Sequence, residues 1–333
     1  MKKLINDPAQ VVSDALDGFA TAHADLVKVN RRPDYVVRAD APVAGKVALV
    51  SGGGSGHEPL HIGYVGRGML DAAVPGPVFT SPTPDPILAA AKAVDSGAGV
   101  LFIVKNYTGD VLNFETAAEL AQLDGIDART VLVDDDVAVQ DSTFTAGRRG
   151  VAGAVLLEKI VGAAAERGDS LDACQALGER VNARMRSMGV ALTACTVPHV
   201  GRPSFELADD EIEIGVGLHG EPGRRRAKLA GAAELAAELV GPVLDDLAAP
   251  AGTPVLMLVN GMGGTPQSEL YIICQEARRL VEAAGLQLAR SLVGDYATAL
   301  EMQGCSVTVL LLDDETADLW DAPVATPALR RGL

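Results

Sequence analysis

The sequence of 333 residues is long enough for two domains of ordinary size, each with its own core. Hydrophobic residues make up 48% and charged residues 22% of the chain, as in ordinary globular proteins, while aromatic residues reach only 4%, so the cores must be aliphatic. With 28 Lys and Arg against 44 Asp and Glu, the formal net charge of −16 argues against nucleic acid or an anionic membrane as the main partner.

Helices and short buried strands alternate along the first part of the chain. The predicted elements are a helix from Asp7-Pro8 to about Ala20, a strand at 46–50, a helix from Thr83-Pro84-Asp85 to Gly97, a strand at 100–104, a helix at about 114–123 and a strand at 131–133. Such a succession predicts a mostly parallel sheet with helices on both faces. The fold class is therefore α/β, with an N-terminal three-layer domain.

The pattern changes further along the chain. The predicted elements are helices at 150–167 and from Asp169-Ser170 to about Met188, an alternating strand at 212–218, helices near 227–247 and 266–285, and strands at 255–259, 288–293 and 306–312. We place a domain boundary near residue 185. Residues 1–185 are expected to form the α/β domain with the glycine loop and Asp110, and residues 186–333 a smaller C-terminal α+β domain with His219.

The spacing of the cysteines and the first residues of the chain indicate the cellular compartment of the protein. The four cysteines lie far apart and form no Cys-x-x-Cys pair, so buried free thiols are expected at Cys174, Cys195, Cys274 and Cys305. The start of the chain lacks the apolar segment of a signal peptide, and no stretch approaches the length of a membrane span. We therefore expect a cytoplasmic protein.

The glycine-rich segment 51–59 is the strongest local signal. Glycines after a strand let the backbone approach a ligand closely and direct N–H groups at its oxygens. A Walker A loop needs Gly-Lys-Ser/Thr, whereas this chain has Gly56-His57-Glu58, and the dinucleotide fingerprint needs a third glycine where His57 stands. A histidine that closes such a loop favours a functional role over a purely structural one.

In a parallel sheet the ligand lies beyond the carboxyl ends of the strands, where 52–57, 105–110 and 134–136 are all expected. Asp110 precedes a predicted helix and can be a helix cap as well as a catalytic group. Lys105 can be a strand-end ion-pair partner or a ligand contact. The three aspartates at 134–136 could suggest Mg²⁺, but three adjacent residues cannot all face one ion from a strand end, so a solvated or hydrogen-bonded turn is favoured for most of them.

His219 closes the alternating run 212–218 and falls on the face opposite its apolar residues. Glycines at 215, 217 and 220 remove side chains around it and leave room for a ligand. The remaining histidines, His23, His61 and His199, have no such setting. We expect them to be structural or surface residues.

Several long segments are similar, in the same order, to the K subunit of dihydroxyacetone kinases. They are Lys2-Lys3-Leu4-Ile5-Asn6, Val43-Ala44-Gly45-Lys46, the glycine loop, Phe79-Thr80-Ser81-Pro82-Thr83-Pro84-Asp85, Lys105-Asn106-Tyr107-Thr108-Gly109-Asp110, Thr145-Ala146-Gly147-Arg148-Arg149-Gly150, Leu218-His219-Gly220-Glu221-Pro222-Gly223 and Trp320-Asp321-Ala322-Pro323. The resemblance covers essentially the full length of the chain and is highly specific.

The resemblance implies a covalent mechanism. It assigns His219 as the residue that holds the ketone of dihydroxyacetone as a hemiaminal, so that glycerol, which has no carbonyl, is rejected. His57 and Asp110 match the catalytic residues that hydrogen-bond the substrate and assist proton removal from its hydroxyl. The remaining substrate contacts match Gly54, Ser55, Gly56 and Lys105, and no metal is expected on this chain.

The resemblance also implies partners. The chain ends soon after Trp320-Asp321-Ala322-Pro323, so it resembles the stand-alone form, in which a separate L subunit carries ADP and Mg²⁺. A phosphotransferase-system phosphoprotein recharges that subunit, and the K subunit is expected to be a homodimer. No cofactor is therefore expected here.

Two alternatives remain open. The substrate could be another short ketose such as erythrulose, or the protein could be a ketose sensor that acts on a transcription regulator and catalyses nothing. Sensor relatives tend to lose the covalent histidine or its helpers. Because His57, Asp110 and His219 are all present, the kinase role is favoured.

Overall fold

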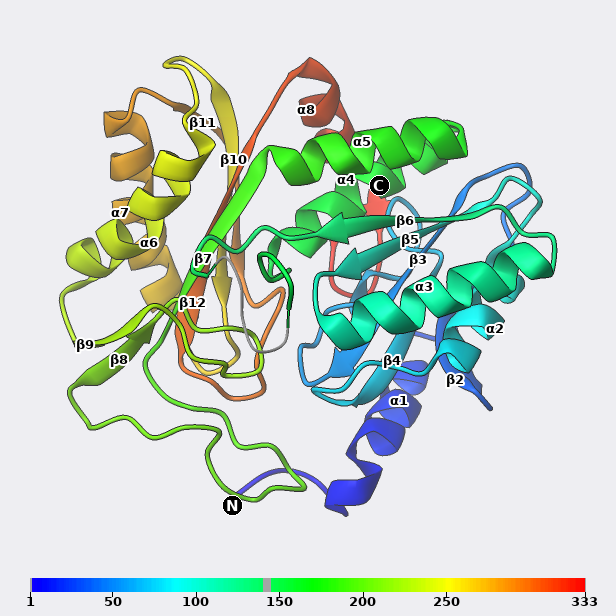
Figure 1. The fold of residues 1–333 in the computed structure, drawn as a ribbon, viewed down its shortest axis with the longest axis horizontal. Coiled ribbons are helices and arrows are strands. Elements are labelled where there is room, and N and C mark those ends of the chain that lie inside the picture. Colours follow the sequence, from blue (N-terminus) through cyan, green and yellow to red (C-terminus); the bar gives the residue numbers. More distant parts are fainter. Residues whose placement is uncertain (1, 140–144, 333) are drawn as a thin grey trace.

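The computed structural model describes residues 2–139 and 145–332, which contain two six-stranded sheets side by side (Figure 1). The strands of the first sheet lie in the order β1 (Val27–Arg31), β2 (Asp34–Arg38), β4 (Ala72–Val78), β3 (Ala48–Ser55), β5 (Val100–Lys105) and β6 (Ala128–Val133). The last four are mutually parallel, and β1 and β2 form an antiparallel edge. The predicted mostly parallel sheet is confirmed.

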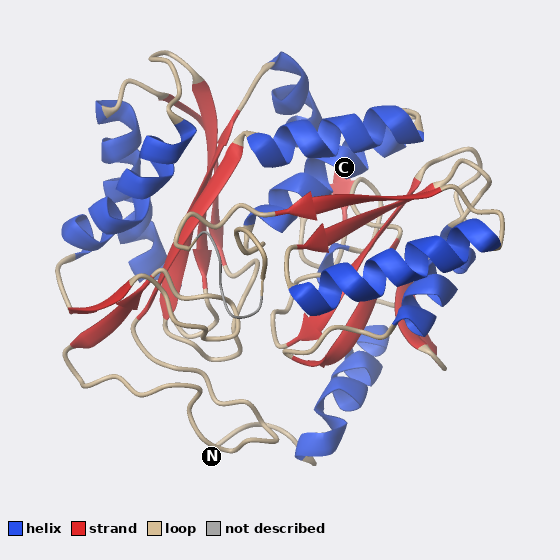
Figure 2. Ribbon diagram, in the orientation of Figure 1, coloured by secondary structure: helices blue, strands red, loops and turns tan. Residues whose placement is uncertain are grey.

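Helices cover both faces of this sheet, which makes three layers (Figure 2). One face carries α2 (Pro84–Val94) and α3 (Thr108–Leu123), and the other carries α1 (Val11–Ala22), α4 (Gly153–Arg167) and α5 (Leu171–Ala183). The period of two along a strand explains the division, because Phe102 of β5 packs under α2 and α3 while its neighbours Leu101 and Ile103 join the opposite core.

The second sheet has the strand order β11 (Gln287–Gly294), β10 (Pro254–Gly261), β12 (Gly304–Leu311), β7 (Met185–Ala191), β8 (Glu211–Ile214) and β9 (Arg225–Lys228). Only β10 and β11 pair in parallel among these strands of the described chain. Helices α6 (Ala232–Leu247) and α7 (Gln267–Ala283) cover its outer face. This arrangement confirms the predicted α+β character of the second part.

The end of the chain returns to the first part of the molecule. Helix α8 (Asp314–Asp321) packs against α4, and the short strands β13 (Val324–Ala325) and β14 (Arg330–Arg331) follow. Ala325 forms a bridge with Arg67, which lies between β3 and β4. The boundary proposed at residue 185 coincides with the start of β7, but the division into 1–185 and 186–333 stays a prediction.

Three predicted boundaries in the second half are wrong. Helix α5 ends at Ala183 rather than near Met188, and β7 follows, because that segment pairs with β12 on one side and β8 on the other. Residues 225–228 form edge strand β9, so α6 begins at Ala232 rather than near 227. Strand β8 ends at Ile214, since Gly215 turns the chain with a φ of 82°. His219 therefore lies in a turn and not at a strand end.

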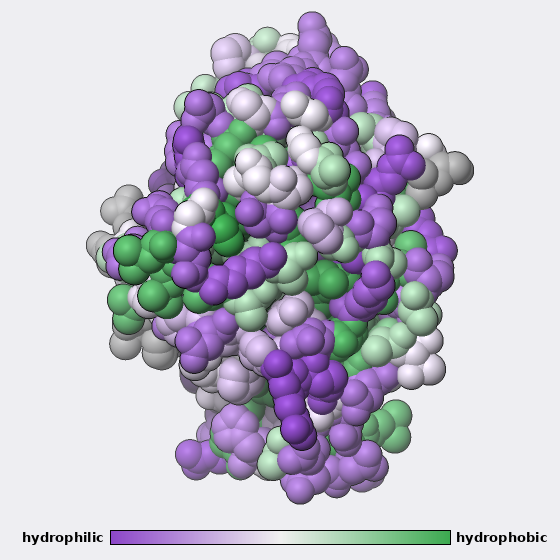
Figure 3. Space-filling model, turned by 90° about the vertical axis from the view of Figure 1, so that its right-hand side faces the viewer, coloured by the Kyte–Doolittle hydropathy of each residue, from purple (hydrophilic) through white to green (hydrophobic). Residues whose placement is uncertain are grey.

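Hydrophilic side chains cover most of the face shown in Figure 3, with smaller hydrophobic areas between them. Among the described residues no helix has the length and apolar character required to span a bilayer. All four cysteines are free thiols, with Cys174, Cys195 and Cys305 buried and Cys274 half-buried.

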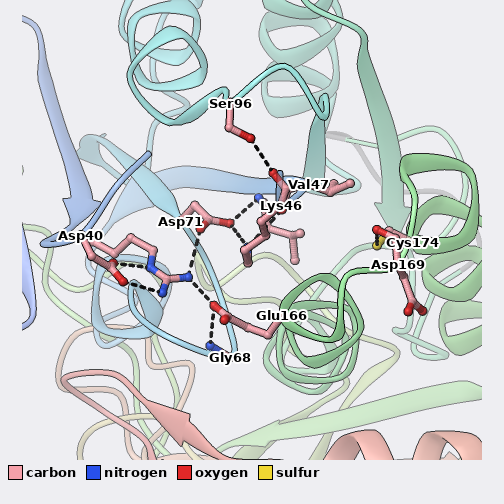
Figure 4. A network of polar contacts seen from close by, with 11 residues as sticks. Asp40, Lys46, Val47, Gly68, Asp71, Ser96, Glu166, Asp169 and Cys174 are labelled. Atoms are coloured by element: carbon pink, nitrogen blue, oxygen red, sulfur yellow. Dashed lines mark hydrogen bonds and ion pairs between the residues drawn. The ribbon is translucent and has the colours of Figure 1, made fainter. Parts of the chain in front are cut away.

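A buried ion-pair network joins the first sheet to α4 (Figure 4). Asp71 accepts hydrogen bonds from Lys46 Nζ at 2.5 Å, from the backbone N–H of Leu49 at 2.8 Å and from Arg38 Nη1 at 3.2 Å. Arg38 also pairs with Glu166 of α4. Because two cations depend on the buried Asp71, this carboxylate has a large effect on stability.

Asp71→Asn keeps the side-chain volume but leaves Lys46 and Arg38 without their buried counter-charge. We expect the free energy of unfolding in urea to fall by about 3 kcal/mol or more. The matched control is Asp40→Asn, which removes a second partner of Arg38 whose side chain is 66% exposed. That change should cost less than about 1 kcal/mol. Equal effects of the two substitutions would contradict the importance of burial here.

Candidate active site

A cavity of about 640 Å³ opens at the carboxyl ends of β3 and β5, beside the N-terminus of α3. Its walls are formed by Gly54, Phe79, Thr80, Ser81, Tyr107, Thr108, Gly109, Asp110, Asn113, His219 and Glu221. His219 and Glu221 are the contribution of the second part of the chain. The cavity therefore lies where the predicted ligand edge of the first sheet meets the turn that carries His219.

His219 is held among three rings. Its ring centroid lies 4.8 Å from His57, 4.8 Å from Tyr107 and 5.2 Å from Phe79. Its Nδ1 lies 2.8 Å from Glu221 Oε1. A carboxylate can only accept a hydrogen bond, which assigns the proton to Nδ1 and leaves the lone pair on Nε2. A neutral imidazole in this state can act as a nucleophile.

Glu221 is positioned by the same turn. Its Oε2 accepts a hydrogen bond from the backbone N–H of His219 at 3.0 Å. A side chain at residue 217 would overlap with this carboxylate, so Gly217 is required next to it. Burial opposes the ionisation of Glu221, but the hydrogen bond and charge of His219, together with the charge of Arg149, lower its pKa to about 2.

His57 is buried directly beside His219. Its Nδ1 donates to the backbone carbonyl of Thr298 at 2.7 Å, and its ring stacks on Phe79 at 4.9 Å between centroids. Burial, with the charges of His219 and Lys105, lowers the pKa of His57 well below its ordinary value. The imidazole is therefore neutral, and its Nε2 is a buried acceptor without a partner among the described residues.

Asp110 lies in the first turn of α3, because this helix begins at Thr108 and not near residue 114 as predicted. Its Oδ1 is buried and has no partner among the residues that the structure describes, and its Oδ2 lies 3.9 Å from Lys105 Nζ. The N-terminus of the helix favours a negative charge at this position. The carboxylate is thus placed on the cavity wall with a free acceptor atom.

Four other residues were predicted as substrate contacts, and their surroundings in the structure differ from one to the next. Gly54 lines the cavity. Strand β3 continues through the glycines to Ser55. The hydroxyl of Ser55 donates a hydrogen bond to the carbonyl of Gly76 at 2.7 Å. The backbone N–H of Gly56 donates to the carboxylate of Glu58. Lys105 is buried behind Asp110. The roles of Ser55, Gly56 and Lys105 as substrate contacts stay predictions.

The three aspartates after β6 have internal partners. Asp135 accepts hydrogen bonds from Val151 N and Gly153 N at the start of α4, and Asp136 pairs with Arg149. Asp134 accepts from Asn182. The favoured hydrogen-bonded turn is confirmed, and the described residues contain no group of three His, Cys, Asp or Glu side chains suited to a metal ion.

Four residues of the site were not identified from the sequence alone. Phe79, Tyr107 and Glu221 lie inside segments that carried the family resemblance, so their motifs were a usable signal. Phe79 has a φ of 57°, which is unfavourable for a residue with a side chain and is found at functional sites. His61 was expected to be structural or on the surface, yet it is buried against Lys105.

Comparisons with known proteins agree with one another. The model of the Dak1 domain matches residues 17–328. The chain is 53% identical, over the full length of both, to the dihydroxyacetone-binding subunit of the PEP-dependent dihydroxyacetone kinase of Escherichia coli. It is 55% identical to the corresponding subunit of PTS-dependent dihydroxyacetone kinase 1 of Listeria innocua, with 98% of this chain and all of that one covered.

Solved structures share the fold. A dihydroxyacetone kinase operon co-activator is 37% identical with a TM-score of 0.89, covering 96% of this chain and 98% of that one. The dihydroxyacetone kinase of C. freundii is 34% identical with a TM-score of 0.88, covering 99% of this chain and 60% of that one.

The lowered pKa of Glu221 predicts a pH-dependent stability. Its ionised form stabilises the fold fully above the unfolded value of 4.5, and this stabilisation is lost as the pH falls through about 2. Glu221→Gln should therefore be less stable near neutral pH by up to about 3 kcal/mol. The difference from wild type should shrink as the pH is lowered from about 6 to about 3.

Urea denaturation at each pH gives this difference directly, with Glu206→Gln, a change at an exposed carboxylate, as the control. If the free energy of unfolding of Glu221→Gln differs from that of wild type by the same amount at every pH, the His219–Glu221 pair does not form.

Proposed function

This chain belongs to the Dak1-domain family, and from that premise we propose that it is the dihydroxyacetone-binding subunit of a dihydroxyacetone kinase. One observation carries the proposal. The nucleophilic Nε2 of His219 belongs to one site with the Nε2 of His57 and the Oδ1 of Asp110, both of which lack a hydrogen-bond partner among the described residues. Such a site can hold a small ketone covalently and accept a proton from its hydroxyl.

Capture begins with attack of His219 Nε2 on the carbonyl carbon. One C–N bond forms, the π bond of the carbonyl breaks, and its electron pair goes to the oxygen, which takes a proton to give the hemiaminal. The imidazole becomes positively charged in the attack, and the ionised Glu221 beside Nδ1 stabilises that charge. The proton then lost from Nδ1 balances the proton that the oxygen takes up, so the hemiaminal is neutral. Glycerol has no electrophilic carbon and cannot react in this way.

Phosphoryl transfer then requires a base for the terminal hydroxyl. Asp110 offers a free carboxylate oxygen and His57 a neutral ring nitrogen, and we assign proton removal to these two catalytic residues. Gly54, Ser55, Gly56 and Lys105 are proposed to complete the substrate contacts. The product is dihydroxyacetone phosphate.

The phosphoryl donor is proposed to be a separate L subunit that carries ADP and Mg²⁺ and is recharged by a phosphotransferase-system phosphoprotein. The relatives named as PEP-dependent or PTS-dependent binding subunits, which this chain matches over 98–100% of its length, support this division of labour. We also propose a homodimer located in the cytoplasm.

A sensor function is the second candidate, because a kinase operon co-activator has the same fold. Fold alone therefore does not distinguish a catalytic subunit from a sensor. The retention of His57, Asp110 and His219 with free reactive atoms favours catalysis. Another short ketose such as erythrulose would be captured by the same chemistry and is tested by substrate comparison.

Covalent capture of the ketose can be tested by measuring the mass of the intact protein. Incubated with dihydroxyacetone, the protein should gain the mass of one substrate molecule after trapping, or show the ketose bonded to the imidazole in a crystal. His219→Ala should lose the adduct and keep the fold, while His199→Ala, at an exposed position, should keep both. An intact ketone lying unbonded beside His219 would disprove the mechanism.

Asp110→Asn separates capture from transfer. Asparagine preserves the size of the side chain but removes most of its basicity, so the rate with a saturating L subunit should fall by about 10²–10⁴-fold while the adduct still forms. A helix cap would be served about equally well by asparagine. A rate within about threefold of wild type would exclude Asp110 from the catalytic residues.

A further inference from the structure

A chain of three buried polar side chains lies behind the cavity. Glu158 of α4 is bonded through its Oε1 to His61 Nδ1 at 2.6 Å, and His61 Nε2 is bonded to Lys105 Nζ at 2.9 Å. All three residues are buried, and Glu158 is fully so. Ser51 Oγ lies 3.0 Å from the same His61 Nδ1, and Glu158 Oε2 has no partner among the described residues. The chain is therefore held together by the two ring nitrogens of His61.

His61 links Lys105 to Glu158. The ammonium of Lys105 donates to Nε2, which places the ring proton on Nδ1 facing Glu158. Burial, aided by the charges of Lys105 and His57, lowers the pKa of His61 well below its ordinary value, so the ring is neutral. Burial raises the pKa of Glu158 well above its ordinary value, and the charge of Lys105 and a hydrogen bond with Ser51 oppose this rise.

Lys105 makes its close hydrogen bond to His61 and not to Asp110. The distance of 3.9 Å between Lys105 Nζ and Asp110 Oδ2 is too long for a hydrogen bond. Gly53 makes room for this position, because a Cβ there would lie 2.6 Å from Nζ. The charge of Lys105 is thus close to Asp110 without occupying either of its oxygens.

We infer that His61 and Glu158 are positioning residues that hold Lys105 back from Asp110. In that position the ammonium leaves the carboxylate oxygens of Asp110 accessible to the substrate hydroxyl. Without His61, Lys105 would move to Asp110 and form a direct ion pair, which would occupy an oxygen and reduce the basicity of the carboxylate. This inference rests on the proposed function, in which Asp110 accepts a proton from the substrate.

The first test is structural and does not depend on activity. In a crystal structure of His61→Leu, the distance from Lys105 Nζ to Asp110 should shorten to about 3 Å. Since this variant removes the hydrogen bond of the buried Glu158 to His61, a double variant with Glu158→Leu replaces both polar groups by apolar ones of similar size. A distance that stays at its wild-type value in a folded variant would overturn the inference.

The second test is kinetic, with dihydroxyacetone and a saturating L subunit. His61→Leu and the double variant should lower kcat about tenfold or more, with KM within about threefold of wild type. His61→Gln, whose amide oxygen can accept from Lys105, should recover most of kcat. A purely structural role would instead lower thermal stability and activity together in the Leu and Gln variants alike, and that result would overturn the inference.

The outcomes separate the two proposals. If wild-type protein neither forms an adduct nor phosphorylates dihydroxyacetone, the proposed function is wrong. If wild type is active and folded His61→Leu keeps kcat within about threefold of it, the positioning role is wrong while the proposed function stands.

Discussion

Helix α4 is buried on every side from Gly153 to Ala165, and both sheets must pack against it at the same time. A helix that is buried all round, and almost entirely apolar, is stable only inside a core. Leu49 and Ile103 from the first sheet, and Leu256 and Leu310 from the second, belong to the same apolar cluster as this helix. The two parts of the chain are therefore joined by a continuous core, and α4 fixes their relative position.

The cavity depends on that relative position, because neither half of the chain contains the complete site. The first half contributes His57 and Asp110, and the second contributes His219 and its partner Glu221. His57 is also oriented from the second half, since the carbonyl of Thr298 accepts the hydrogen bond from its ring and its backbone carbonyl accepts from Thr298 N. α4 further contributes Glu158 to the polar chain behind Asp110. Packing in the core is thereby coupled to atomic positions in the site.

Buried polar groups find hydrogen-bond partners more completely in the ion-pair network of the core than around the cavity. The buried network around Asp71 pairs its cations and carboxylates with each other. Around the cavity, by contrast, buried atoms of His57, Asp110, Tyr107 and Arg149 have no hydrogen-bond partner among the described residues. An unsatisfied buried polar atom costs about 1–3 kcal/mol. Several such atoms lie around one cavity, as expected where a bound substrate supplies the missing hydrogen-bond partners. The unbound protein is less stable as a result.

The features that depend on local pattern could be predicted from the sequence. Apolar runs between helices predicted the parallel strands β3, β5 and β6, and Ser170 marked the start of α5 through a cap that the structure contains. Glycines beside His57 and His219, together with the family motifs, singled out both histidines. These signals are readable because burial and backbone preference are properties of a few neighbouring residues.

The pairing of distant elements could not be predicted from local pattern. Strand β7 exists because β12 and β8 lie on either side of it, and the turn at Gly215 moves His219 off the strand that its alternating neighbours predicted. His61 meets Glu158 from 97 positions away, and His57 meets Thr298 from 241 positions away. The partner of a buried side chain is set by which distant elements pack together, and no local pattern encodes that choice.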